Sequence, residues 1–107
     1  MSLDVYLTRT QPTIVYDANI THNLGKMAKE AGIYYHLWRP EEIGISKAEN
    51  LIIPLQEGLE LLKSDPERFQ KFDSPNGWGL YIHFVPFVEE YLKACIEYPD
   101  AEISISR

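Results

Sequence analysis

Alternating apolar and polar residues at the two ends of the chain constrain its fold more than any other feature. Leu3, Val5 and Leu7 alternate with polar neighbours near the start, and Ile103 and Ile105 do the same near the end. This period of two is typical of a β-strand with one buried face. Because such strands need another layer to cover that face, the sequence predicts an α+β domain in which helices supply the cover.

The order of the segments predicts how the strands are arranged. Residues 3–8 form the first strand, and residues 13–20 resume the strand pattern after a polar connection that contains Pro12, so we expect a hairpin. Residues 101–106 return after a long helical stretch and are expected beside the first strand. We therefore predict a small, mainly antiparallel three-stranded sheet in the spatial order 2-1-3, with about four helices packed on one face. Residues 1–107 are expected to form a single domain.

The first helical segment has signals at both of its ends. Thr21 is predicted to be the N-cap and Gly32 the C′ residue, with Ile33 placed for the hydrophobic contact of a Schellman motif. Residues 34–44 are predicted to be an aromatic connector rather than a helix. Pro40 restricts the residue before it, and the charges that follow break the periodicity.

The second helix is predicted from a capping box at residues 46–49, in which a serine at the N-cap and a glutamate three residues later bond each other's backbone amides. The helix would begin at Lys47. Pro54 lies inside it and lacks an N–H group, so the helix should bend or split there.

Two more helices complete the predicted layer. Asp65 is an expected N-cap for a short helix over residues 66–72, and residues 73–79 consist of turn-forming residues. The fourth helix is expected from about Phe84 to Glu97. Pro86 is acceptable in it only if the helix starts within one turn before the proline.

Charge and composition exclude several classes of function. The chain has 16 acidic and 10 basic side chains, a net charge of −6, and no run of lysine or arginine, so it is not expected to bind nucleic acid. No apolar run approaches the roughly 20 residues of a membrane span, and the first residues lack the pattern of a secretory signal. We therefore expect a cytoplasmic protein without membrane contact.

Cys95 is the only cysteine and lies on an apolar helical stripe, where an inert thiol is expected.

Four strings carry a resemblance to a known family: DVYLTRT, ITHNLGKMAKEAGIYYHLWRPEEIG, NGWGLY and YPDAEISISR. They look like those of a family of small uncharacterised proteins found in bacteria and their phages, and the likeness covers almost the whole chain. The resemblance implies no activity, cofactor or catalytic residue for these positions. A phage-associated accessory protein would be consistent with this resemblance.

A candidate binding site lies at the corner where the second strand becomes the first helix. Thr21, His22 and Asn23 occupy this corner, where free backbone amides and the positive end of a helix dipole can hold an anion or a carbonyl group. The alternative is a plain helix cap in which Thr21 accepts a backbone hydrogen bond and His22 is merely exposed.

Two segments with tryptophan could complete this site. Trp38 and Arg39 offer a flat ring beside a fork of donors, and Asn76 and Trp78 belong to a glycine-rich loop. If both segments meet over the corner, they would form a concave site that stacks a planar ring and binds its polar or anionic substituents. The alternative is that both tryptophans are lids of the core.

No motif supports catalysis. The histidines and the cysteine match no spacing of metal ligands, and neither a nucleophile motif nor a phosphate-binding loop occurs, so no metal or cofactor is expected and an enzyme is unsupported. The favoured function is a non-enzymatic module that binds a small planar, polar or anionic, nucleotide-like ligand. The alternative is an inhibitor or adaptor that binds a host protein through exposed aromatics. A homo-oligomer is compatible with either function.

Overall fold

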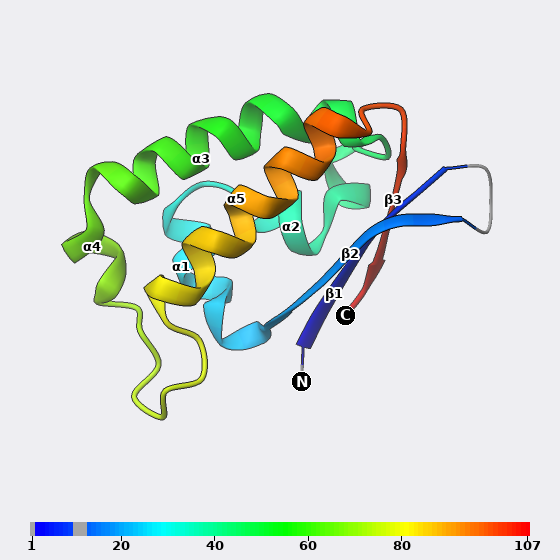
Figure 1. Ribbon diagram of the computed structural model, residues 1–107. Helices are drawn as coiled ribbons and strands as arrows, with labels where there is room; N and C mark the ends of the chain where they lie inside the picture. Colours follow the sequence, from blue (N-terminus) through cyan, green and yellow to red (C-terminus); the bar gives the residue numbers. More distant parts are fainter. Residues whose placement is uncertain (1, 10–12) are drawn as a thin grey trace.

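Three strands form one antiparallel sheet in the order β2-β1-β3 (Figure 1). The structure is a computed structural model that describes residues 2–9 and 13–107. The strands are β1 (Ser2–Thr8), β2 (Ile14–Thr21) and β3 (Glu102–Ser106). The predicted α+β fold and strand order 2-1-3 are confirmed. Pro12 and most of the predicted polar connection lie outside the described residues.

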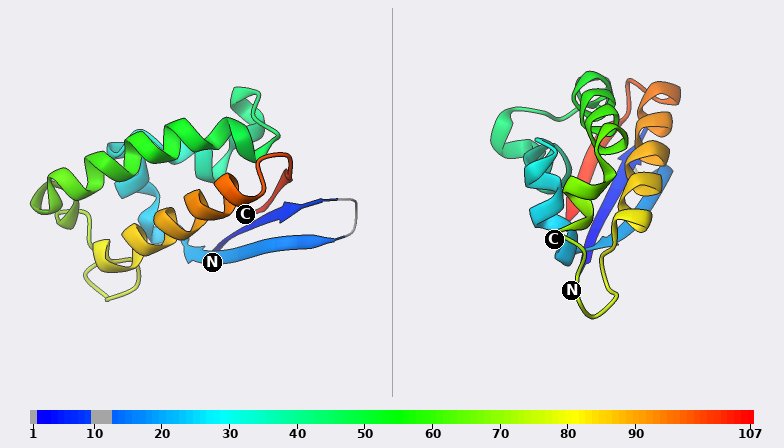
Figure 2. Two further views of the ribbon diagram at one scale, coloured as in Figure 1. Left: turned by 45° about the horizontal axis from the view of Figure 1, so that its top comes forward. Right: turned by 90° about the vertical axis from the view of Figure 1, so that its left-hand side faces the viewer.

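The strand register places the predicted apolar residues on one face. Val5 pairs with Ile105 and Leu7 with Ile103 across the β1–β3 ladder, so all four side chains point to the same side. Figure 2 shows that the helices form a layer on one side of the sheet. Val5 and Leu7 are fully buried under this layer, which confirms the predicted buried face.

Five α-helices and three short 3₁₀ segments lie between β2 and β3 in the described residues. They are η1 (His22–Leu24), α1 (Gly25–Glu30), α2 (Tyr34–Trp38), η2 (Pro40–Ile43), η3 (Ala48–Leu51), α3 (Ile52–Ser64), α4 (Pro66–Gln70) and α5 (Tyr81–Glu97). The two long helices, α3 and α5, pack side by side, and α5 packs on β2 (Figure 1). The prediction of about four helices roughly matches these five α-helices, and α2 is the one that was not predicted.

The ends of the first helical segment are as predicted. The Thr21 hydroxyl accepts a hydrogen bond from the backbone N–H of Asn23 at 3.3 Å. At the other end Gly32 has a φ of 78°, its N–H donates to the Lys29 carbonyl, and the N–H of Ile33 donates to the Ala28 carbonyl. These two bonds are those of a Schellman motif, which turns the chain sharply into α2.

The segment predicted as an aromatic connector contains the helix α2, so that prediction was wrong. The backbone hydrogen bonds of α2 start from the Schellman turn, since the N–H of Leu37 donates to the carbonyl of Ile33. One face of the helix is buried through Leu37 and Trp38, and Trp38 stacks on Tyr34 with ring centroids 5.4 Å apart. Burial of this face outweighs the weak helical pattern, and Pro40 ends the helix.

The predicted capping box does not form the start of the next helix. Lys47 is extended and takes the N-cap position without a side-chain hydrogen bond. The backbone N–H groups of Ala48 and Glu49 instead donate to carbonyl oxygens of the segment before β3, at 2.9 Å each. The helix therefore begins at Ala48, because neighbouring backbone supplies the acceptors that the serine was expected to provide.

The predicted interruption of this helix is present. Residues 48–51 form the 3₁₀ segment η3 and the α-helix α3 starts at Ile52. Pro54 therefore lies in the first turn of α3, where a backbone N–H group would have no partner within the helix. The change from 3₁₀ to α geometry accommodates the proline.

The last helix, α5, begins earlier than predicted. It starts at Tyr81 rather than Phe84, because the Asp73 carboxylate accepts a hydrogen bond from the Tyr81 N–H at 2.6 Å. Pro86 consequently lies more than one turn inside the helix, which contradicts the condition set for it. The residue whose carbonyl loses its partner, Ile82, has an exposed side chain, so water can reach this turn.

Cys95 lies in the core on the buried face of α5. Burial raises the pKa of its thiol to about 12, so the thiol stays protonated at neutral pH.

In the described part of the chain, none of the helices has the length and apolar character needed to cross a membrane.

Tyr91 on α5 should tolerate the loss of its hydroxyl. The side chain is fully buried and stacks on Tyr16, but its hydroxyl has no hydrogen-bond partner among the described residues. Burial raises the pKa of this phenol well above its usual value. Because an unsatisfied buried hydroxyl costs free energy, Tyr91→Phe should raise the free energy of unfolding by about 1 kcal/mol. Urea denaturation measures this change, and a loss of stability would reveal a hydrogen bond that the structure lacks.

Candidate functional site

The loop formed by residues 73–79 packs against the corner between β2 and η1. The side-chain amide of Asn23 donates to the Trp78 carbonyl at 2.9 Å. Gly79 has a φ of 103°, and a Cβ atom at this position would lie 2.9 Å from the Cβ of Asn23 and 3.1 Å from a methyl carbon of Thr21. Glycine therefore lets the loop backbone approach the corner closely.

The loop is held by its own hydrogen bonds as well. The Asn76 side-chain oxygen accepts from the Trp78 N–H at 2.9 Å and from the Ser74 hydroxyl at 2.6 Å. Backbone bonds join Ser74 to Gly77 and Gly79. These contacts fix the backbone of Trp78, while 71% of this residue remains exposed.

We expect Gly79→Ala to displace this loop. A methyl group would meet Asn23 and Thr21 inside normal contact distance, and alanine is strained at this φ, so the free energy of unfolding should fall by about 1–2 kcal/mol. The emission maximum of Trp78 should shift with it. Gly77→Ala is the control, because Gly77 also has positive φ but no atom of the described residues lies within 4 Å of the added carbon. Equal losses in both variants would mean that close packing on the corner contributes nothing.

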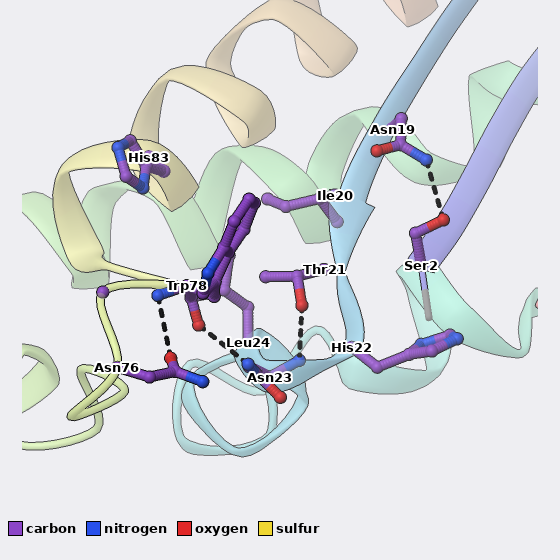
Figure 3. A pocket seen from close by; sticks show the side chains of 12 residues that line it. Ser2, Asn19, Ile20, Thr21, His22, Asn23, Leu24, Asn76, Trp78 and His83 are labelled. Carbon is purple, nitrogen blue, oxygen red and sulfur yellow. Dashed lines mark hydrogen bonds between the residues drawn. The ribbon is translucent and has the colours of Figure 1, made fainter.

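Between the loop and the corner lies an open cleft of about 860 Å³, here called the corner cleft (Figure 3). Five of the seven predicted site residues line it: Thr21, His22, Asn23, Asn76 and Trp78. The structure adds Ser2, Asn19 and His83, which sequence reasoning did not assign to the site. Asn19 and Ser2 come from neighbouring strands and are joined by a hydrogen bond of 3.0 Å, a contact that only the strand register brings about.

The other two predicted residues lie elsewhere. Trp38 is only 2% exposed, so it covers the core and offers no free ring face to the corner cleft. Arg39 lines a second cleft, together with Trp38 and His22. The two tryptophans therefore do not meet over the corner.

His22 connects the two clefts because it lines both. The Trp38 indole N–H donates to His22 Nδ1 at 2.8 Å, so this nitrogen carries no hydrogen and the neutral ring has its hydrogen on Nε2. In Figure 3 the imidazole points away from Trp78. His22 is thus held by the core tryptophan rather than merely exposed, and Nε2 is its available donor.

Backbone groups contribute less to the corner than predicted. Thr21 accepts from the Asn23 N–H, so the helix cap uses one of the amides that an anion would need. Recognition groups in the corner cleft are therefore mainly side chains. In residues 2–9 and 13–107, no three histidine, cysteine, aspartate or glutamate side chains gather closely enough to hold a metal ion.

Arg39 remains charged in its cleft. Hydrogen bonds to the Tyr34 hydroxyl at 3.4 Å and to Glu42 at 2.8 Å raise the pKa of the guanidinium above its usual value.

Comparisons of the chain with family models, with curated proteins and with solved structures found no match.

Proposed function

We propose that the protein binds a small molecule with a planar, polar ring in the corner cleft, and that Trp78 is the stacking surface. One observation carries the proposal: Trp78 is 71% exposed beside a cleft, although three hydrogen bonds to its own backbone and to Asn76 hold its loop in place. A ring presented on a fixed backbone loses little conformational entropy when a ligand stacks on it.

The other lining groups fit a ring with both donors and acceptors. Asn19 and Asn76 each carry an amide, Thr21 carries a hydroxyl and His83 an imidazole. The cleft of about 860 Å³ is within the size range of small-molecule sites. A heterocyclic base or a similar metabolite has the flat shape and the mixed polar edge that this lining can recognise.

A thermal-shift screen of nucleobases, nucleosides and related heterocycles tests the proposal. A ligand at 100 times its dissociation constant should add about 2.7 kcal/mol of stability by mass action. Trp78→Ala should abolish the shift and Trp78→Phe should keep most of it. Ile53→Ala is the control, because Ile53 is an exposed apolar residue on α3 outside the cleft.

A binding site for a protein is the second candidate. It is favoured by the exposure of Ile82, which is 67% exposed only four residues after Trp78, so two large apolar side chains are available as anchors. The ligand proposal is wrong, and this one replaces it, if two results are obtained together. No heterocycle shifts the melting temperature of the wild type, and a protein that the wild type captures from host lysate is captured neither by Trp78→Ala nor by Ile82→Ala.

A further inference from the structure

Basic residues gather around the second cleft, although the chain is acidic. Lys26 and Lys29 come from α1, Arg39 follows α2 and Arg107 follows β3. These are four of the ten lysines and arginines in a chain whose net charge is −6. We call the cleft that they line, of about 500 Å³, the basic cleft. The fold concentrates positive charge here from segments that lie far apart in the sequence.

Only part of this charge is neutralised within the protein. Arg39 pairs with Glu42 and Arg107 pairs with Glu41, both at 2.8 Å. Lys26 and Lys29 are exposed and form no ion pair with any residue in the described ranges 2–9 and 13–107. The Lys29 ammonium lies 4.7 Å from the centre of the Tyr34 ring. The two lysines therefore leave uncompensated positive charge at the mouth of the cleft.

Three acceptors that line the basic cleft already accept a hydrogen bond from the protein. The Trp38 carbonyl accepts from Arg107 at 2.8 Å, and His22 Nδ1 accepts from the Trp38 indole. The Tyr34 hydroxyl accepts from Arg39, so its own hydrogen remains available. What the cleft still offers is a set of donors: two ammonium groups, unused guanidinium N–H groups, the His22 Nε2–H and a phenol.

A lining of this kind selects a ligand rich in acceptors. An uncharged amide or sugar would leave its own donors unpaired, whereas a phosphate group presents only oxygens and negative charge. We propose that the basic cleft binds the phosphate groups of a small molecule, either free phosphate or pyrophosphate or the phosphates of a nucleotide. This site is separate from the ring-binding surface at Trp78, and the proposal does not depend on it.

Calorimetric titration with pyrophosphate at low ionic strength tests this site. Lys26→Gln and Lys29→Gln should each weaken binding about tenfold, since each removes a charge-assisted hydrogen bond, and the double variant should bind no pyrophosphate measurably. Lys71→Gln is the matched control, because it removes the same charge from an exposed position outside the cleft. Thermal melts should be nearly unchanged for all four variants, because both cleft lysines are exposed and neither forms an ion pair with a described residue.

Parallel titrations identify the source of the phosphate. In the Trp78→Ala variant, which lacks the proposed ring-binding surface, ADP binding more tightly than pyrophosphate would indicate a nucleotide, and equal binding of ADP and pyrophosphate would indicate the phosphate groups alone. Trp78→Ala should leave pyrophosphate binding unchanged, which separates this proposal from that for the corner cleft. The proposal would be overturned if Lys71→Gln weakened pyrophosphate binding as much as the cleft variants do. It would also be overturned if the protein bound a DNA duplex through the two cleft lysines but did not bind pyrophosphate.

Discussion

Removal of residues 102–107 should abolish the cooperative unfolding transition of the protein. These residues comprise β3 and Arg107; β3 pairs with β1, and its isoleucines extend the apolar face of the sheet that the helices cover. Each half-buried isoleucine contributes about 1–2 kcal/mol through burial, and the ladder and the Arg107 bond to the Trp38 carbonyl are lost as well. The sum approaches the total stability of a small domain, about 5–15 kcal/mol.

Point variants separate the effect of the buried face from that of chain length. Ile105→Asn places an amide on the helix-covered face beside Val5, and Ser104→Asn places the same amide on the exposed face one residue away. The first should lower the free energy of unfolding by about 2–3 kcal/mol and the second by less than about 0.5 kcal/mol. A truncated chain that melts cooperatively at the wild-type temperature would contradict the role assigned to β3.

The sheet could be predicted from sequence because its signal is local. Alternation of Leu3, Val5 and Leu7 determines which face is buried, and the same alternation at Ile103 and Ile105 fixes the facing strand. The Schellman ending at Gly32 was equally readable, since it depends on one glycine and the residues next to it.

The errors arose where distant segments determine local structure. Helix α2 forms because Leu37 and Trp38 find a core to enter, which residues 34–44 alone do not reveal. The start of η3 uses carbonyl oxygens from residues more than 45 positions later, which compete with the side chain of Ser46. Both cases are tertiary contacts overriding a weak local pattern.

The two clefts were predictable to different degrees. The corner cleft is built from residues next to two turns, and turn chemistry is legible in sequence, so Asn23, Asn76 and Trp78 were placed together. The basic cleft collects single cations at positions 26, 29, 39 and 107, and a search for runs of lysine and arginine passes over them. Its recognition required the fold.

Gly58→Ala should destabilise the protein, although helix propensity predicts the opposite. Gly58 lies in the interior of α3, where replacement by alanine would ordinarily gain about 0.8–1 kcal/mol. The added carbon would lie 2.6 Å from the Cγ2 methyl of Ile33 and 3.2 Å from its Cδ1. Ile33 is buried in the Schellman turn, and its branched side chain cannot rotate away cheaply. The expected loss of unfolding free energy is about 2–3 kcal/mol.

A double-mutant cycle tests whether this contact is the cause. Ile33→Ala removes the methyl that obstructs the new carbon, but leaves a cavity that should cost about 2–4 kcal/mol by itself. In the double variant the alanine at position 58 partly fills that cavity without a clash, so the combined loss should be smaller than the sum by at least about 1 kcal/mol. Urea denaturation of the four proteins measures the coupling. Additive losses, or a Gly58→Ala variant more stable than the wild type, would mean that α3 can move away from the turn at little cost, and that the close approach at Gly58 does not hold these two elements together.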